Sequence, residues 1–227
     1  MSYVRLKHAL SAIALRSLDG PALPPAVAAM AVYARRAGSG VAVPAALLAR
    51  DAGVAPGALR LTLLETGLFI EEDGAIALAP PYRPHADYFG RQVTRLIEAR
   101  RLAAEPTPPG MPDELHRGAA LFNAGLFFEA HEYWEDVWRA SRPPERSFYH
   151  GLVQAAAGCY HAEKGNAHGA AVLLAKARAK LELYAPRYLG LDIAALLAAL
   201  GTVRAGRPPQ GTGADAGMLL RLAGPLR

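Results

Sequence analysis

The sequence predicts a mainly α-helical protein, with one β-hairpin in its N-terminal domain and an up-and-down helical bundle in its C-terminal half. Three observations support this fold class. Alanine and leucine, both strong helix formers, are abundant along the whole chain. Apolar residues recur at helical spacing in most segments. Asp73-Gly74 lies between two short apolar runs, a pattern typical of a hairpin turn.

The N-terminal segment predicts four helices followed by the hairpin. The helices are expected at residues 3–17, 26–36, 44–51 and 56–66, and the hairpin at 68–78. Asp19-Gly20-Pro21 ends the first helix, and Gly53 suits the left-handed position that closes the third. Helices and a hairpin in this order resemble a winged helix over about residues 5–80, on topology and without a motif.

Prolines mark the boundary between the two halves. Pro80, Pro81 and Pro84 follow the hairpin, and a helix is expected at 85–104. Residues 105–110 then contain three prolines, which cannot propagate a helix, and are expected to form a linker. The predicted organisation is a winged-helix-like domain at 1–82, a helix and proline-rich linker at 83–110, a helical bundle at 111–205 and a flexible tail at 206–227.

The C-terminal half predicts five helices separated by short breaks. They are expected at 112–124, 126–141, 145–164, 167–185 and 190–204. The breaks contain Gly125, Pro143-Pro144, Gly165 and Pro186. Because short connections make consecutive helices antiparallel neighbours, the segment is expected to form an up-and-down bundle.

Composition bounds the location and the partners. The lone cysteine, Cys159, allows no intramolecular disulfide. No apolar run approaches the roughly 18 residues of a membrane span, and no signal-peptide pattern opens the chain. A cytoplasmic location without a membrane partner is therefore expected. The net charge of +5 is spread along the chain, which permits nucleic-acid contact without requiring it.

Two motifs in the C-terminal half resemble a known family. Residues 122–138 read Phe-Asn-Ala-Gly-Leu-Phe-Phe-Glu-Ala-His-Glu-Tyr-Trp-Glu-Asp-Val-Trp. Residues 148–157 read Phe-Tyr-His-Gly-Leu-Val-Gln-Ala-Ala-Ala, with Tyr160-His161 and Lys164-Gly165-Asn166 after them. Over about residues 113–185 these motifs resemble the domain of unknown function 309 family. Trp134 departs from a commonly aliphatic position, which indicates local repacking. The resemblance implies a helical bundle and no known reaction.

The helix expected at 126–141 has an apolar stripe with polar residues at its edge. Phe127, Trp134 and Trp138 share the apolar stripe and are expected in the core. His131 and Glu135 are four residues apart, so their side chains can converge, and Glu132 lies beside them.

The next helix, at 145–164, carries a second polar stripe. His150, Gln154, Ala157 and His161 fall on one face, and Gly151 and Gly158 lie beside it. Because two glycines let another helix approach closely, this polar face is expected to be partly buried. Lys176, Arg178 and Lys180, on the following helix, are expected to form a solvated face.

These polar residues are open to three interpretations. The pocket candidates are His131, Glu132, Glu135, Gln154, His161 and Trp138. They can form a buried structural network, bind a small polar ligand, or hold a divalent metal through Glu132, Glu135, His131 and His161. The leading hypothesis is a non-enzymatic interaction or ligand-binding module, and the alternative is a metal-dependent, hydrolase-like enzyme that uses the same pocket.

The N-terminal domain has two candidate partners. A recognition helix at 56–66 would offer DNA few basic side chains, and the acidic hairpin residues 71–73 would repel phosphates. A protein partner or self-association is therefore favoured. A DNA-binding regulator is the alternative, and its candidate contacts are Arg35, Arg36, Arg50 and Arg60.

Overall fold

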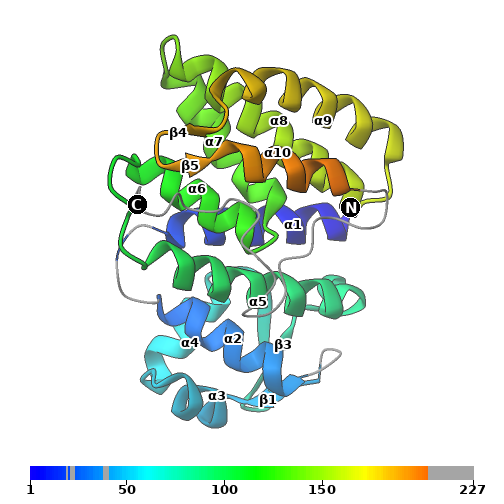
Figure 1. Cartoon of the computed structure of the whole chain (residues 1–227). Coiled ribbons are helices and arrows are strands. Elements are labelled where there is room, and N and C mark those ends of the chain that lie inside the picture. The colour runs from blue at the N-terminus through cyan, green and yellow to red at the C-terminus, as the bar shows by residue number, and fades with distance from the viewer. Residues whose placement is uncertain (19, 21–23, 38–40, 204–227) are drawn as a thin grey trace. The chain divides into compact units, whose positions relative to one another are not determined.

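The chain folds into two compact units, Met1–Arg100 and Arg101–Arg227, in the computed structural model (Figure 1). The structure describes residues 1–18, 20, 24–37 and 41–203. The predicted tail at 206–227 and residues Gly38-Ser39-Gly40, whose composition predicts the end of the second helix, lie outside the described residues. The mainly helical class with a small N-terminal sheet is confirmed. The domain boundaries drawn from the sequence stay predictions.

The first unit alternates helices with a small antiparallel sheet. Its helices are α1 (Ser2–Ser17), α2 (Pro25–Ala37), α3 (Ala45–Ala52) and α4 (Pro56–Leu64), and its strands are β1 (Val43–Pro44), β2 (Phe69–Glu72) and β3 (Ala75–Leu78). The strand order is β1-β3-β2, with Val43 opposite Ile76 and Phe69 opposite Leu78. The predicted hairpin is confirmed.

Positive backbone φ angles explain the predicted hairpin turn and the predicted helix cap. Asp73 and Gly74 have φ values of 52° and 76°, the combination that a tight primed hairpin turn requires. Gly53 caps α3 in the left-handed conformation, with φ of 64°. The prediction that the third helix begins at residue 44 is wrong, because Pro44 is extended and pairs with β3 as an edge strand.

The core of the first unit is aromatic at its centre. Tyr33 and Phe89 pack edge-to-face, as do Tyr33 and Phe69, with centroid distances of 6.0 and 5.1 Å. The backbone N–H of Leu78 donates to the buried Tyr33 hydroxyl at 3.0 Å. Phe89 lies on α5 (Ala86–Ala103), which follows the 3₁₀ helix Pro80–His85. The hairpin and α5 thus share one core with α2.

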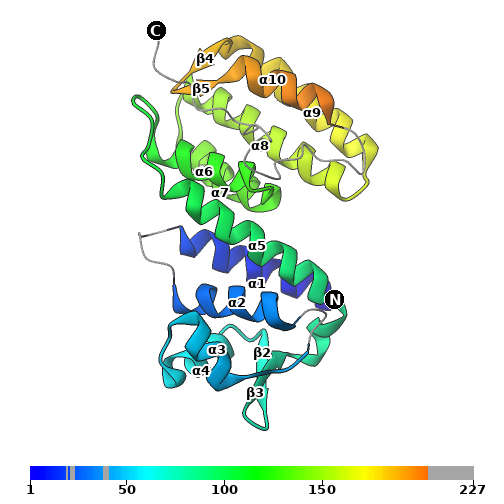
Figure 2. The same ribbon diagram turned by 60° about the horizontal axis from the view of Figure 1, so that its bottom comes forward.

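The second unit is a helical bundle in which consecutive helices pack on one another (Figure 2). The helices are α6 (Asp113–Asn123), α7 (Phe127–Ala140), α8 (Glu145–Glu163), α9 (Ala167–Leu181) and α10 (Ile193–Thr202). The described part of the chain contains no helix long and apolar enough to span a bilayer.

The bounds predicted for the last two helices, 167–185 and 190–204, are wrong. Helix α9 ends at Leu181 and continues only as the 3₁₀ turn Glu182–Tyr184, and α10 begins at Ile193 and not at 190. Between them, β4 (Arg187–Tyr188) and β5 (Leu191–Asp192) form a small hairpin. Asp192 caps α10 by accepting from the Ala195 N–H at 2.8 Å, which fixes the helix start.

Glycines set two close contacts in the bundle. A Cβ added at Gly151 or Gly158 would lie 2.9 or 2.8 Å from Leu181 or Leu174 of α9, so the predicted close approach of a helix is confirmed. Trp134 is fully buried, and its indole occupies the space that a side chain at Gly118 would need. The indole therefore packs directly against α6 at Gly118, and the repacking expected relative to an aliphatic residue stays a prediction.

Candidate functional site

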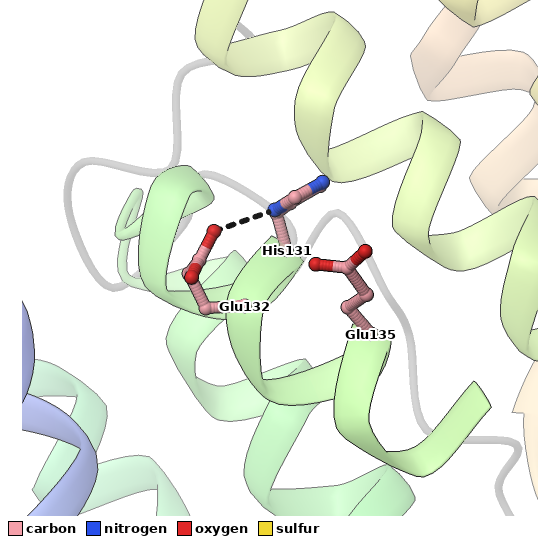
Figure 3. Close-up of side chains that lie close together, drawn as sticks. All are labelled: His131, Glu132 and Glu135. Atoms are coloured by element: carbon pink, nitrogen blue, oxygen red, sulfur yellow. Dashed lines mark hydrogen bonds and ion pairs between the residues drawn. The ribbon is translucent and has the colours of Figure 1, made fainter. Parts of the chain in front are cut away.

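Three polar side chains of α7 converge on one side of the helix (Figure 3). Phe127, Ala130 and Trp134 turn the opposite face of the helix into the core. One ligand atom from each of His131, Glu132 and Glu135 lies within 4.8 Å of the other two. Together these residues, called here the α7 cluster, combine one imidazole and two carboxylates, the ligand types that bind divalent metals.

Glu132 fixes the orientation of the His131 ring. The His131 Nδ1 lies 3.1 Å from Glu132 Oε1. An ionised carboxylate only accepts hydrogen bonds, so Nδ1 carries a proton, and in the neutral imidazole the lone pair is then on Nε2. The other ring nitrogen is directed away from Glu132 in Figure 3. Metal-binding histidines commonly donate their second N–H to a carboxylate in this way.

Glu135 is held by a neighbouring arginine of the same helix. Arg139 Nη2 donates to Glu135 Oε1 at 2.8 Å, and Arg139 Nη1 lies 3.6 Å from Asp136. The Arg139 side chain is 62% exposed, and exposed ion pairs of this kind contribute at most about 1 kcal/mol. A divalent cation would therefore have only a weak competitor for Glu135.

The residues predicted on the second stripe form a separate network. Lys180 Nζ donates to Gln154 Oε1 at 3.1 Å, so the Gln154 amide nitrogen donates to His150 Nε2, 3.2 Å away. Trp138 stacks on His150 with a centroid distance of 4.5 Å. Burial, with Lys180 and then Arg146 nearby, lowers the pKa of His150. This network, called here the α8 network, holds three helices together.

His161 serves a helix cap. Its Nδ1 lies 2.9 Å from the Asn166 amide nitrogen, and Asn166 Oδ1 accepts from the Gly169 N–H at the start of α9. His161 does not belong to the set of side chains whose ligand atoms lie within 4.8 Å of one another, which consists of His131, Glu132 and Glu135. The predicted metal set therefore separates into the α7 cluster and a capping histidine.

Lys180 and Arg178 contact other helices in ways that the sequence does not predict. The solvated face predicted for this helix is confirmed for Lys176 and wrong for Lys180, which is half-buried against Gln154. Arg178 donates to the carbonyl of Leu197 at 2.8 Å. The one sequence signal for the burial of Lys180 is that it lies three residues after Ala177 and one before Leu181, both of which are buried.

The arginines proposed for DNA contact are largely engaged by carboxylates. Arg50 donates to Asp51 at 2.9 Å, and Arg36 pairs with the same carboxylate. Hydrogen bonds from Arg50 and Arg36 lower the pKa of Asp51. Arg60 pairs with Glu71 of the hairpin. Arg35 is exposed at the end of α2.

The second unit is thus a helical bundle that carries a histidine–carboxylate cluster on one helix. Residues 115–173 match the family described as Domain of unknown function (DUF309), and the resemblance seen in the motifs is confirmed there. The matched segment contains all of α7 and α8. No curated protein and no solved structure matches the chain. The winged-helix identity of the first unit stays a prediction.

Proposed function

We propose that the DUF309-containing unit is a non-enzymatic ligand-binding module, and that its ligand is a divalent cation held by the α7 cluster. The convergence of three ligand atoms within 4.8 Å carries this proposal. Binding is favoured over catalysis because Gln154 and His161, once expected in the same pocket, already have hydrogen-bond partners in the fold.

The donor set favours borderline transition metals. Imidazole nitrogen with carboxylate oxygen suits Zn²⁺, Co²⁺ or Ni²⁺, whereas Mg²⁺ and Ca²⁺ prefer oxygen ligands alone. His131 Nε2 and one Glu135 oxygen would bind the ion, and Glu132 would orient the imidazole or supply a third ligand. The side chains of His131, Glu132 and Glu135 are 27%, 43% and 24% exposed. Water molecules could therefore complete the coordination of the ion.

Calorimetric titration of the untagged full chain with ZnCl₂ tests the proposal. We expect stoichiometric binding that weakens roughly tenfold or more in His131→Ala and in Glu135→Gln, since each removes a ligand. Asp136→Asn is the matched control, because it removes an 84% exposed carboxylate of the same helix outside the cluster. Equal affinity in all four proteins would contradict a site at the α7 cluster.

We propose a second role for the first unit, as a winged-helix-like module that docks a protein. Ion pairing of Arg36, Arg50 and Arg60 supports it, because the carboxylates of Asp51 and Glu71 beside these guanidinium groups lower the net positive charge that a phosphate backbone would meet. Fluorescence anisotropy with labelled duplex DNA at low salt tests this role. No binding is expected, and salt-sensitive binding that Arg60→Ala weakens would contradict it.

A further inference from the structure

A buried tyrosine hydroxyl of the second unit has no partner within the fold. Tyr149 of α8 is 2% exposed, and its hydroxyl forms no hydrogen bond among the described residues. Buried hydroxyl groups normally have a hydrogen-bond partner, because leaving water without one is unfavourable. The Tyr149 hydroxyl is therefore available to a molecule that binds from solvent.

Acidic and phenolic groups surround this hydroxyl. Glu145 lies four residues before Tyr149 on α8, a spacing that places both side chains on one face of the helix. The Tyr188 hydroxyl of β4 donates to Glu145 Oε1 at 3.3 Å. Burial raises the pKa of Tyr149, and the nearby carboxylates of Glu114 and Glu145 raise it further. Glu114, Glu145, Tyr149 and Tyr188 are called here the Tyr149 site.

The carboxylates of the Tyr149 site lack a positive partner. Neither Glu114 nor Glu145 forms an ion pair among the described residues. Arg146 follows Glu145 in sequence, but it donates to the carbonyls of Trp138 and Arg139 at the end of α7, at 3.3 and 3.2 Å. Glu114 is exposed and Glu145 is half-buried, so a ligand can reach both from solvent. The site therefore offers two carboxylates and a phenol oxygen to a cation.

Aromatic rings lie on one side of the site. Tyr188 packs on Phe148 and on Tyr184, with centroid distances of 4.9 and 4.7 Å. Tyr184 and Tyr188 are half-buried, so part of each side chain borders solvent. Ring faces attract organic cations such as ammonium groups. Aromatic rings beside two carboxylates thus favour an alkylammonium ion over a hard metal ion, which would need more oxygen ligands.

We propose that the Tyr149 site binds a primary ammonium group. An ammonium group has three N–H donors and no acceptor, which matches three acceptors: Glu114, Glu145 and the Tyr149 oxygen. Charge-assisted hydrogen bonds to the two carboxylates supply most of the affinity. The group belongs either to a free polyamine or to a lysine side chain of a protein partner. The Tyr149 site shares no residue with the α7 cluster, so the two proposals stand independently.

NMR titration of the full chain, observed at the tyrosine rings, tests the proposal. The probes are spermidine, a capped glycine–lysine–glycine peptide, and the same peptide acetylated on its lysine side chain. We expect saturable shifts of Tyr149 and Tyr188 with the charged probes and none with the acetylated peptide, which has lost its ammonium group. Tighter binding of spermidine would assign the site to a polyamine, and tighter binding of the lysine peptide would assign it to a protein partner.

Two variants identify the contacts of the ammonium group. Glu145→Gln should weaken binding of the charged probes roughly tenfold or more, because it removes a charge-assisted hydrogen bond. Glu163→Gln makes the same change at the other end of α8 and is the matched control. Tyr149→Phe should weaken binding without lowering the urea midpoint of unfolding, because the hydroxyl that it removes has no partner in the fold.

Three results would overturn the ammonium site. The first is the absence of shifts with both charged probes, and the second is equal binding of the acetylated peptide. The third is an affinity for the charged probes that Glu145→Gln and Tyr149→Phe both leave unchanged. A parallel titration with calcium chloride separates the cation classes, since shifts of Tyr149 and Tyr188 with calcium and with neither amine would assign a metal site in place of an ammonium site.

Discussion

The α7 cluster and the α8 network lie on neighbouring helices of one bundle, and both contain half-buried histidines. In the α8 network, Lys180 donates to Gln154 and Gln154 donates to His150, so the ring nitrogen facing Gln154 is occupied. In the α7 cluster, Glu132 accepts from Nδ1 of His131, so in the neutral imidazole the lone pair is on Nε2, which has no hydrogen bond within the cluster. A closed chain of donors and acceptors stabilises helix packing, whereas an unused lone pair beside a carboxylate provides ligating capacity.

The largest expected effect is on stability, from the buried indole of Trp134 that anchors α7 in the core. Trp134→Ala should lower the free energy of unfolding by about 3–5 kcal/mol, because it leaves a cavity beside Gly118 in the core. Chemical denaturation measures this loss. A decrease in the free energy of unfolding of less than about 1 kcal/mol would mean that the Trp134 indole does not anchor α7.

The next effect separates the two sets of polar residues. Gln154→Leu should lower the free energy of unfolding by about 1–2 kcal/mol, because His150 and Lys180 both lose a partner, and should leave zinc binding unchanged. Glu132→Gln should show the opposite pattern, with little change in stability and weaker zinc binding. Parallel denaturation and calorimetry compare the two variants, and equal stability losses would remove the distinction.

A smaller effect concerns pH. The pKa of His150 is lowered in the fold, so the unfolded chain binds its proton first as the pH falls below about 6.5. Stability from this group is complete above that pH and declines below it, toward the lowered pKa of the folded state. Lys180→Met should raise the His150 pKa in an NMR titration, since it removes a nearby cation. An unchanged titration would contradict the network.

The smallest effect is at Arg139. Arg139→Gln should change the free energy of unfolding by less than about 0.5 kcal/mol, because the pair with Glu135 is solvent-exposed. It should also tighten zinc binding slightly, since Glu135 loses a competing cation. Calorimetry of this variant beside the wild type measures the difference, and weaker binding would assign Arg139 a supporting role instead.

Helix positions could be predicted because apolar spacing and breaking residues are local. The hairpin at Asp73-Gly74 and the cap at Gly53 follow from backbone preferences of single residues. The strand at Val43–Pro44 could not be predicted, because two residues become a strand only by pairing with β3. The hairpin at 187–192 was missed for the same reason: Leu191–Asp192 was expected in a helix, and Arg187–Tyr188 in the break before it.

The candidate site was partly predictable. Convergence of His131 and Glu135 follows from helix geometry, and the close approach at Gly151 and Gly158 follows from their missing side chains. The separation of His161 from this cluster depended on Asn166. Gln154 is separate from the cluster because it accepts from Lys180, which lies 26 residues further along the chain. Side-chain partners on other helices and loops are not fixed by spacing within one helix.

Histidine ¹⁵N NMR during zinc titration tests most directly whether the α7 cluster is open while the α8 network is closed. The Nε2 resonance of His131 should shift on addition of zinc while its Nδ1 stays protonated, and the resonances of His150 and His161 should not move. Shifts at His150 or His161 in place of His131, or no shift at any histidine, would contradict a cation site at the α7 cluster.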